Sequence, residues 1–236
     1  MDKYSGTSPG QPLGGKDNMY DLCLFDLDGT LTDPKIGITR SYQYALAAFG
    51  IHEEADNLAK FIGPPIRENF RDYYGFSDLD TERAVAIFRE YFSEKGLLEN
   101  TIYPEIPGAL QKLKDSGKTL AVATSKVTVY TNPILEHFGI DKYFSFVSGD
   151  EMDGRNTKNG KCDIIRIALD MLDPERKKRA VMIGDRKHDI HGANDTGIDS
   201  IGVTWGYGPR AELEEAGATV IADTVDELCR LIMEES

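Results

Sequence analysis

Two aspartates, Asp26 and Asp28, stand directly after a mostly apolar run over residues 21–25. A run of this kind is typical of a strand that is buried on both faces of a parallel sheet. Ligands of such sheets bind beyond the carboxyl ends of the strands, and a turn at Gly29 lets both carboxylates line one crevice. Carboxylates in such a place can attack as nucleophiles or transfer protons. The pattern therefore predicts a phosphoryl-transfer site.

A third carboxylate, Asp185, follows another expected strand at 180–183, and Asp189 comes four residues later. We expect Asp185 to reach the same edge of the sheet as Asp26 and Asp28. Three clustered carboxylates repel one another, and a hard cation removes that repulsion. Mg²⁺ fits these oxygen ligands and leaves room for waters and a substrate phosphate. The alternative is that Asp185 is only a helix cap or a turn residue.

Candidate phosphate ligands follow at two further places. Thr124 and Ser125 come at the end of an expected strand, where a hydroxyl and the N–H groups of a helix start can bind a phosphate oxygen. The alternative is that one of them merely caps the following helix. Lys161 precedes a predicted helix and can neutralise both an attacking carboxylate and a phosphate, although a solvated surface lysine is the alternative. Lys158 is close enough to take this role instead.

Strand and helix patterns alternate after residue 104, which predicts a parallel sheet with helices on both faces. Before that point, apolar residues recur at helical spacing, and no strand pattern is seen from about residue 35 to residue 100. We therefore expect an all-helical insertion at 35–103, within a core formed by 19–34 and 104–236. The predicted strands are 21–25, 119–123, 144–147, 180–183, 200–203 and 219–221, and the predicted helices of the core are 109–116, 127–138, 163–172, 189–196, 211–216 and 225–233.

Composition excludes several other classes of protein. The 236 residues include 40 acidic and 27 basic side chains, a net charge of −13, which disfavours a nucleic-acid partner. No apolar run approaches the length of a membrane span, so no membrane partner is expected. Three scattered cysteines without a Cys-x-x-Cys pair predict neither a disulfide framework nor a zinc site, and they favour the cytoplasm.

The first 18 residues are rich in Gly, Pro, Ser and Asp and show no periodicity. We expect residues 1–18 to be a flexible leader or an added segment, with Met19 as a candidate start.

The motifs together resemble those of the haloacid dehalogenase superfamily of phosphohydrolases. Asp26-Leu27-Asp28-Gly29-Thr30 matches its first motif, Thr124-Ser125 its second, and Gly184-Asp185 with Asp189 its fourth. The third motif departs from the common Lys-Pro form, because Asn159-Gly160-Lys161-Cys162-Asp163 has no proline. The resemblance covers nearly everything from residue 19 to the C-terminus and implies a Rossmann-like doubly wound core with an inserted helical cap.

The resemblance also implies a role for each motif residue. Asp26 is expected to attack phosphorus and form an aspartyl-phosphate, while Asp28 protonates the leaving alcohol and then activates water. Asp26, Asp185 and the backbone carbonyl of Asp28 are expected to bind Mg²⁺. The phosphate is expected to be bound by the Gly29 and Thr30 amides and by Thr124, Ser125 and Lys161. Asp189 is expected to support the metal or the lysine.

The segment Phe61-Ile62-Gly63-Pro64-Pro65 resembles the cap of phosphoglycolate phosphatase-like members. This likeness implies a phosphatase acting on a small phosphorylated metabolite. Just after this segment of the cap, Arg67 is the candidate ligand of a substrate anion such as a carboxylate, and the alternative is a solvated helix residue after the Gly-Pro-Pro turn. A 5'-nucleotidase and a phosphomutase of the β-phosphoglucomutase kind stay open as alternatives. Carbon–halogen hydrolysis is disfavoured by the extra aspartates, and a noncatalytic binding protein is less expected. A monomer and a homodimer are both compatible with the sequence.

Overall fold

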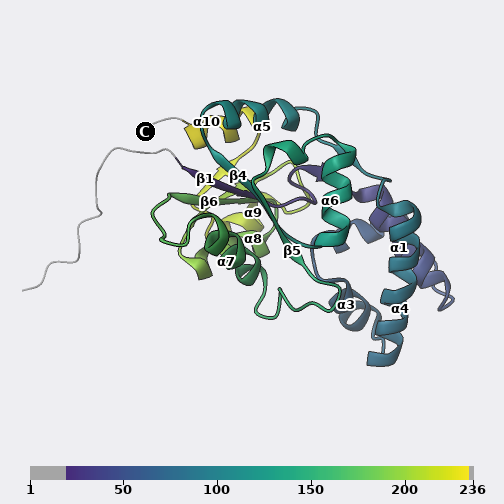
Figure 1. Ribbon diagram of the computed structural model, residues 1–236. Coiled ribbons are helices and arrows are strands. Elements are labelled where there is room, and N and C mark those ends of the chain that lie inside the picture. Colours follow the sequence, from purple (N-terminus) through teal and green to yellow (C-terminus); the bar gives the residue numbers. More distant parts are fainter. Residues whose placement is uncertain (1–19, 234–236) are drawn as a thin grey trace, which may run out of the picture.

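A computed structural model describes residues 20–233, and the predicted leader at 1–18 lies outside them. Its main sheet is formed by β1 (Leu22–Phe25), β4 (Thr119–Val127), β5 (Phe146–Asp150), β6 (Ala180–Gly184), β7 (Asp199–Val203) and β8 (Val220–Ala222). The strands lie in the order β5-β4-β1-β6-β7-β8 (Figure 1), and every neighbouring pair is parallel. All six predicted strands are confirmed, with small shifts at their ends.

The predicted helices of the core are also confirmed. They are α5 (Ile106–Asp115), α6 (Thr128–His137), α7 (Lys161–Leu172), α8 (Lys187–Thr196), α9 (Arg210–Glu215) and α10 (Val225–Met233).

The central strand β1 shows why the sheet needs helices on both faces. Successive side chains of a strand point to opposite faces. Cys23 and Phe25 belong to the apolar cluster that contains the buried faces of α5 and α10, whereas Leu22 and Leu24 belong to the cluster with α7 and Ala193 of α8. In Figure 1, α5 and α10 accordingly lie on one side of the sheet and α7 and α8 on the other. The predicted doubly wound α/β architecture is thus confirmed.

A helical unit, residues 35–96, is inserted between two short strands, β2 (Thr32–Asp33) and β3 (Thr101–Ile102). It consists of α1 (Lys35–Ala47), α2 (Ala55–Leu58), the 3₁₀ turn η1 (Ala59–Phe61), α3 (Ile66–Glu68), the π-helical η2 (Asn69–Tyr73), α4 (Asp78–Tyr91) and the π-helical η3 (Phe92–Gly96).

The helical unit has an aromatic core of its own. Tyr42 is fully buried, and its ring lies 4.9 to 5.3 Å from the rings of Phe61, Phe70 and Phe88. The hydroxyl of Tyr42 accepts a hydrogen bond of 2.7 Å from the side-chain amide of Asn69. This cluster is separate from the two apolar clusters that flank the sheet. The unit therefore holds itself together by contacts that do not involve the sheet.

The expectation that residues 35–103 contain only helix is wrong at its C-terminal end. Thr32 and Asp33 of β2 pair antiparallel with Ile102 and Thr101 of β3. Pairings of two residues are too short to show an alternating pattern in the sequence. The two chain segments that enter and leave the helical unit are thereby joined to each other.

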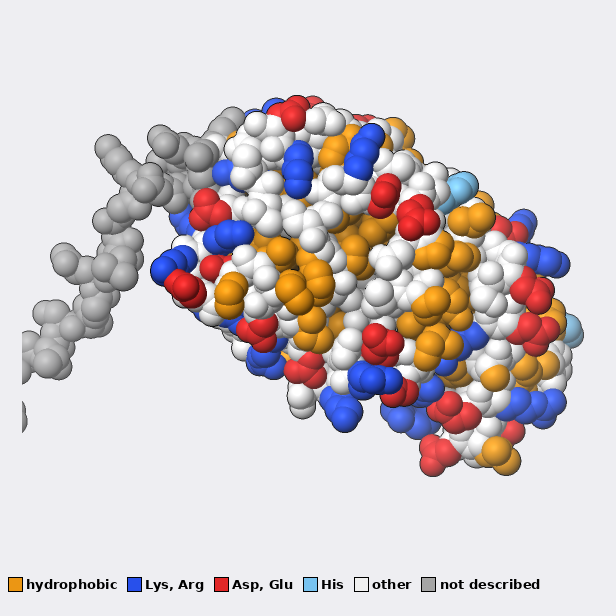
Figure 2. Space-filling view, in the orientation of Figure 1, with side chains coloured by type: hydrophobic (Ala, Val, Ile, Leu, Met, Phe, Trp, Pro, Cys, Tyr) orange, Lys and Arg blue, Asp and Glu red, His pale blue; other side chains and the backbone are white. Residues whose placement is uncertain are grey.

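No helix within residues 20–233 is long and apolar enough to cross a membrane. On the face shown in Figure 2, basic and acidic side chains are interspersed and do not separate into a basic stripe.

Candidate active site

The strand order places the candidate site at the centre of the sheet. From β1 the chain runs outward through β4 and β5, and then returns to the other side of β1 with β6. Ligands of doubly wound sheets bind at such a reversal, beyond the carboxyl ends of the strands. Asp26 follows β1 and Asp185 follows β6, and the Asp26 amide donates a hydrogen bond of 2.9 Å to the carbonyl of Ile183. The two aspartates are therefore brought together by neighbouring strands.

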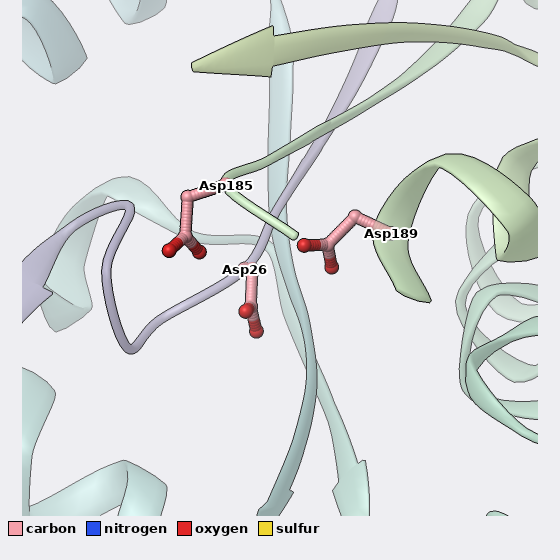
Figure 3. A group of neighbouring side chains, drawn as sticks. All are labelled: Asp26, Asp185 and Asp189. Carbon is pink, nitrogen blue, oxygen red and sulfur yellow. The ribbon is translucent and has the colours of Figure 1, made fainter. Parts of the chain in front are cut away.

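Three carboxylates meet at this edge, from Asp26, Asp185 and Asp189 (Figure 3). One oxygen of each lies within 4.8 Å of the others, and the three residues are 7%, 0% and 1% exposed. Asp189 comes from the first turn of α8, where its Oδ2 accepts a hydrogen bond of 3.0 Å from the Arg186 amide. Such closely spaced, buried negative charges need a positive partner.

Lys161, at the start of α7, supplies one such partner. Its Nζ lies 2.7 Å from Asp26 Oδ1 and also forms an ion pair with Asp189. Burial lowers the pKa of Lys161, but the charges of Asp189 and Asp26 outweigh this effect and raise it overall. Lys158, the alternative, is exposed in a turn. The structure thus places Lys161, and not Lys158, beside Asp26.

Asp185 forms no ion pair within the described part of the chain. Its oxygens accept a hydrogen bond of 2.7 Å from the Tyr207 amide and one of 3.4 Å from the Thr30 hydroxyl. Burial, and then the charges of Asp189 and Asp26, raise the pKa of Asp185 to about 8. A carboxyl group of this kind fits a cation, because a bound metal would supply the missing positive charge. Asp26, Asp185 and Asp189 are therefore the carboxylates that could hold a metal ion.

Two glycines leave the space that Asp185 occupies. Gly29 has a φ of +84°, and a Cβ atom there would clash with the Asp185 carboxylate. A Cβ atom on Gly206 would clash with Asp185 and with the Gly29 carbonyl. The loops after β1 and β7 therefore approach Asp185 more closely than any other residue type would permit.

Asp28 pairs with a different lysine, Lys126, for which the sequence predicted no role. The Nζ of Lys126 lies 2.6 Å from Asp28 Oδ2, and the two side chains are only 9% and 13% exposed. Asp28 Oδ1 is buried and has no hydrogen-bond partner among the described residues. Burial raises the pKa of Asp28, although Lys126 opposes this effect. The only signal in the sequence was the position of Lys126 directly after Thr124-Ser125.

The backbone amides of the loop after β1 differ in their hydrogen bonding. Those of Gly29 and Thr30, the expected phosphate ligands, donate to the carbonyls of Thr32 and Leu27 at 2.7 and 3.3 Å. These bonds close the turn, which the spacing of the motif could not show. The amides of Leu27 and Asp28 have no hydrogen-bond partner among residues 20–233.

Thr124 and Ser125 lie within β4, which continues to Val127 before α6 begins. Thr124 is buried and its hydroxyl accepts a hydrogen bond of 3.3 Å from the Lys126 amide, whereas Ser125 is exposed. Neither caps α6, whose N-cap residue is Val127. The capping alternative is therefore wrong.

Arg67 is not directed at these groups. It lies in α3, and its Nε and Nη2 donate to the two carboxylate oxygens of Glu82 at 2.6 and 3.1 Å. The sequence could not show this pairing, because 15 residues separate the partners.

Comparisons with known proteins identify relatives of this chain. A model of the haloacid dehalogenase-like hydrolase family matches residues 23–203. The 5'-nucleotidase of Pseudomonas aeruginosa is 45% identical over 195 residues, which cover 82% of this chain and 87% of the relative. The tyrosine-protein kinase PtkA of Mycobacterium tuberculosis is 39% identical over 210 residues, 88% of this chain and 70% of the relative.

Two further matches are named as phosphatases. The phosphoglycolate phosphatase of Aquifex aeolicus is 31% identical over 187 residues, which cover 79% of this chain and 85% of the relative. The crystal structure of a predicted phosphatase from Clostridium acetobutylicum superimposes with a TM-score of 0.86 at 45% identity, covering 91% of this chain and 99% of that one. The expectation of a phosphoric monoester hydrolase is thereby confirmed, and the chain belongs to the haloacid dehalogenase-like hydrolases as a phosphatase of that family.

Proposed function

We propose that this phosphatase depends on Mg²⁺ and hydrolyses a small phosphomonoester metabolite through an aspartyl-phosphate on Asp26. The observation that carries the proposal is the different setting of two aspartates that are two residues apart. Asp26 is paired with Lys161, whereas Asp28 is paired with Lys126 and keeps one buried oxygen that accepts no hydrogen bond from residues 20–233. Carboxyl groups held in different environments can take different roles in one reaction.

In the first step, a carboxylate oxygen of Asp26 forms a bond to phosphorus and the ester P–O bond breaks. Asp28 gives its proton to the departing oxygen, which leaves as an alcohol. The raised pKa of Asp28, caused by burial, supports its role as proton donor. Proton transfer by a positioned acid contributes on the order of 10²–10⁴-fold to the rate.

In the second step, Asp28 takes a proton from water as the water oxygen bonds to phosphorus. The bond between phosphorus and Asp26 breaks, which releases inorganic phosphate and returns both aspartates to their starting states. Two displacements of this kind replace one difficult direct attack.

The metal would be held by Asp26, Asp185 and the backbone carbonyl of Asp28. When bound, Mg²⁺ neutralises negative charge on the oxygens of the transferred phosphoryl group. Asp189 would support the site by orienting Lys161, with which it forms an ion pair. The buried carboxyl of Asp185, which lacks an ion pair in the described residues, supports this assignment.

The transferred phosphate would be bound by Lys161, Thr124 and Ser125, together with backbone N–H groups of the loop after β1. The Gly29 and Thr30 amides are engaged within that loop. We therefore add the neighbouring amides of Leu27 and Asp28, which have no partner among the described residues, as the donors that face the phosphate.

The helical insertion would act as a cap over this site, and we propose that the cap comprises residues 35–103 and the core residues 19–34 and 104–236. Its separate aromatic core lets it move as one body. The paired segments β2 and β3 would form the hinge. A cap that closes over the substrate protects a phosphoenzyme from stray water.

The preferred substrate would be a phosphoglycolate-like small molecule, with a nucleoside 5'-monophosphate as the second candidate. The second candidate is favoured by the 45% identity to the 5'-nucleotidase of Pseudomonas aeruginosa. Arg67 remains the proposed ligand of a substrate carboxylate, which would compete with Glu82 for its guanidinium. A cytoplasmic location is proposed because Cys23, Cys162 and Cys229 are free thiols.

The test is phosphate release from a panel of phosphomonoesters, measured with Mg²⁺ and with a chelator. The panel contains phosphoglycolate, nucleoside monophosphates, hexose phosphates and pyrophosphate. We expect metal-dependent release that is lost in Asp26→Asn. The matched control is Asp21→Asn, at the opposite end of β1. It should retain activity because the Asp21 side chain is exposed, lies away from the site and accepts a hydrogen bond from the Arg179 amide, which an asparagine oxygen can also accept.

Full activity of Asp26→Asn would contradict the covalent mechanism. Release that is unaffected by the chelator would contradict the metal. Conversion of a hexose phosphate into an isomer without release of phosphate would indicate the phosphomutase alternative.

A further inference from the structure

Lys126 is a second lysine at the site, and its partner is the second aspartate. Its Nζ lies 2.6 Å from Asp28 Oδ2, with both side chains largely shielded from water. Lys161 pairs with Asp26 and Asp189, so each of the two proposed catalytic aspartates has a lysine of its own. Removing one member of such a pair leaves a buried charge without compensation.

The ion pair leaves Asp28 with one oxygen for chemistry. Oδ2 is occupied by Lys126, while Oδ1 is buried and has no hydrogen-bond partner in the described part of the chain. An acid can transfer a proton efficiently only when its oxygen lies within hydrogen-bond reach of the reacting atom. Lys126 therefore fixes which oxygen of Asp28 is available and where it lies.

Lys126 also contacts the helical unit. Its Nζ lies 4.7 Å from the centroid of the Phe92 ring, which belongs to η3. Phe92 in turn stacks on Phe88 of α4 at 5.8 Å and meets the ring of Tyr130 of α6 edge-on at 5.3 Å. Lys126 thus lies between Asp28 of the core and an aromatic residue that belongs to the helical unit.

We propose that Lys126 is a positioning residue, which holds the Asp28 carboxyl for proton transfer and couples its placement to the helical unit through Phe92. This inference rests on the proposed function for its kinetic consequences, but its structural part does not. The alternative is that the Lys126 ammonium binds the transferred phosphate directly.

The kinetic test compares two kinds of leaving group in Lys126→Met. An alkyl phosphate, such as phosphoglycolate or AMP, needs a proton on its leaving oxygen, whereas p-nitrophenolate departs readily without one. The ratio kcat/KM reports the steps up to attack on phosphorus, so it excludes the later attack of water on the phosphoenzyme. We expect kcat/KM for the alkyl phosphate to fall on the order of 10²-fold, with little change for p-nitrophenyl phosphate. Lys126→Arg, which keeps the charge, should restore part of the loss.

Two further variants test the coupling and its specificity. Phe92→Leu should lower kcat/KM for the alkyl phosphate by roughly two- to fivefold, which corresponds to the usual strength of a cation–π contact. The matched control is Lys142→Met, which removes a lysine 5.1 Å from the Tyr143 ring on the core. This variant should leave kcat/KM unchanged for both substrates. An equal effect of Phe92→Leu on both substrates would overturn the coupling.

Equal losses for the two leaving groups in Lys126→Met would overturn the positioning role and indicate phosphate binding. A crystal structure of the same variant gives a readout that needs no turnover. We expect Asp28 to turn away from its wild-type position, and an unmoved Asp28 would overturn the inference. If the wild-type protein released no phosphate from any substrate, the proposed function would fail, and the crystal structure alone would decide the role of Lys126.

Discussion

Asp26 and Asp28 are two residues apart, yet they lie in different surroundings. Lys161 pairs with the first and Lys126 with the second, and the side chains of both pairs are at most 13% exposed. Buried ion pairs are costly to break, because a single remaining charge has no solvent to stabilise it. At the scale of the residue, the site is therefore held by two lysines from separate elements.

The first prediction concerns Lys161. In the presence of a chelator, Lys161→Met should lower the free energy of unfolding by about 3 kcal/mol, because Asp26 and Asp189 lose their buried partner. Mg²⁺ should restore part of this loss by taking over the neutralisation. The measurement is urea unfolding with and without Mg²⁺. Lys158→Met is the matched control. Because Lys158 is exposed, this variant should have the same free energy of unfolding as the wild-type protein. Equal stabilities of the two variants would contradict the prediction.

The second prediction concerns Gly29. Gly29→Ala and Gly50→Ala both place a methyl group on a left-handed backbone, at φ of +84° and +72°. The strain alone costs about 1–2 kcal/mol at each. Only at Gly29 does the methyl group displace the Asp185 carboxylate, since nothing lies within 4 Å of a Cβ atom at Gly50.

We therefore expect Gly29→Ala to lose Mg²⁺ binding and phosphatase activity, while Gly50→Ala keeps both. Calorimetric titration with Mg²⁺ measures the first effect. Undiminished Mg²⁺ binding by Gly29→Ala would show that the close approach of the Gly29 backbone to Asp185 is not needed for metal binding.

At the scale of the element, the helical unit is stabilised by aromatic packing around Tyr42. Its hydroxyl is the partner of Asn69, which is itself 8% exposed. The unit is joined to the core by the β2–β3 pairing and by Arg186, whose Nη1 donates to the Ile62 carbonyl at 2.7 Å. Its stability and its attachment therefore depend on different residues.

Tyr42→Phe should lower the free energy of unfolding by about 1 kcal/mol, because the buried amide of Asn69 loses its best acceptor. Tyr44→Phe removes an exposed hydrogen bond of 3.1 Å to Glu90 and should be neutral. Chemical unfolding of both variants checks the difference. An equally stable Tyr42→Phe protein would mean that Asn69 finds another acceptor.

At the scale of the whole molecule, helices cover both faces of the sheet. The side chains of the central strand β1 are therefore shielded from water on both faces. Cys23 of β1 is 0% exposed, and burial raises the pKa of its thiol from 9.0 to about 12. The folded protein therefore keeps a proton that the unfolded chain loses above pH 9. The stability that this group contributes is complete below pH 9 and decreases as the pH rises from 9 towards 12.

Wild-type protein should consequently lose up to about 1.4 kcal/mol per pH unit more than Cys23→Ala in this range. Unfolding free energies of both proteins, measured at intervals from pH 7 to 11, test this expectation. Below pH 8 the unfolding free energies of the two proteins should differ by a constant amount, because the thiol is protonated in both the folded and the unfolded state. This constant difference measures the effect of the missing sulfur, and any change in it above pH 8 measures the effect of the proton. Parallel curves over the whole range would contradict the raised pKa of the thiol.

The sequence by itself determined the elements of the core and the residues that follow them. Apolar runs and helical spacing depend on neighbours along the chain, so the six strands and the helices after residue 104 could be predicted to within a few residues. Because carboxyl ends of parallel strands share one edge, the proximity of Asp26 and Asp185 could also be predicted from the sequence.

Only the tertiary structure decided the strand order, the β2–β3 pairing and the partners of the charged side chains. Lys126 and Asp28 are 98 positions apart in the sequence, and no local pattern records which carboxylate a flexible lysine reaches. The same holds for the pairing of Arg67 with Glu82 and for the loop bonds made by the Gly29 and Thr30 amides. Long-range packing and the electrostatics of buried charges set these contacts, because they depend on which surfaces meet after the chain has folded.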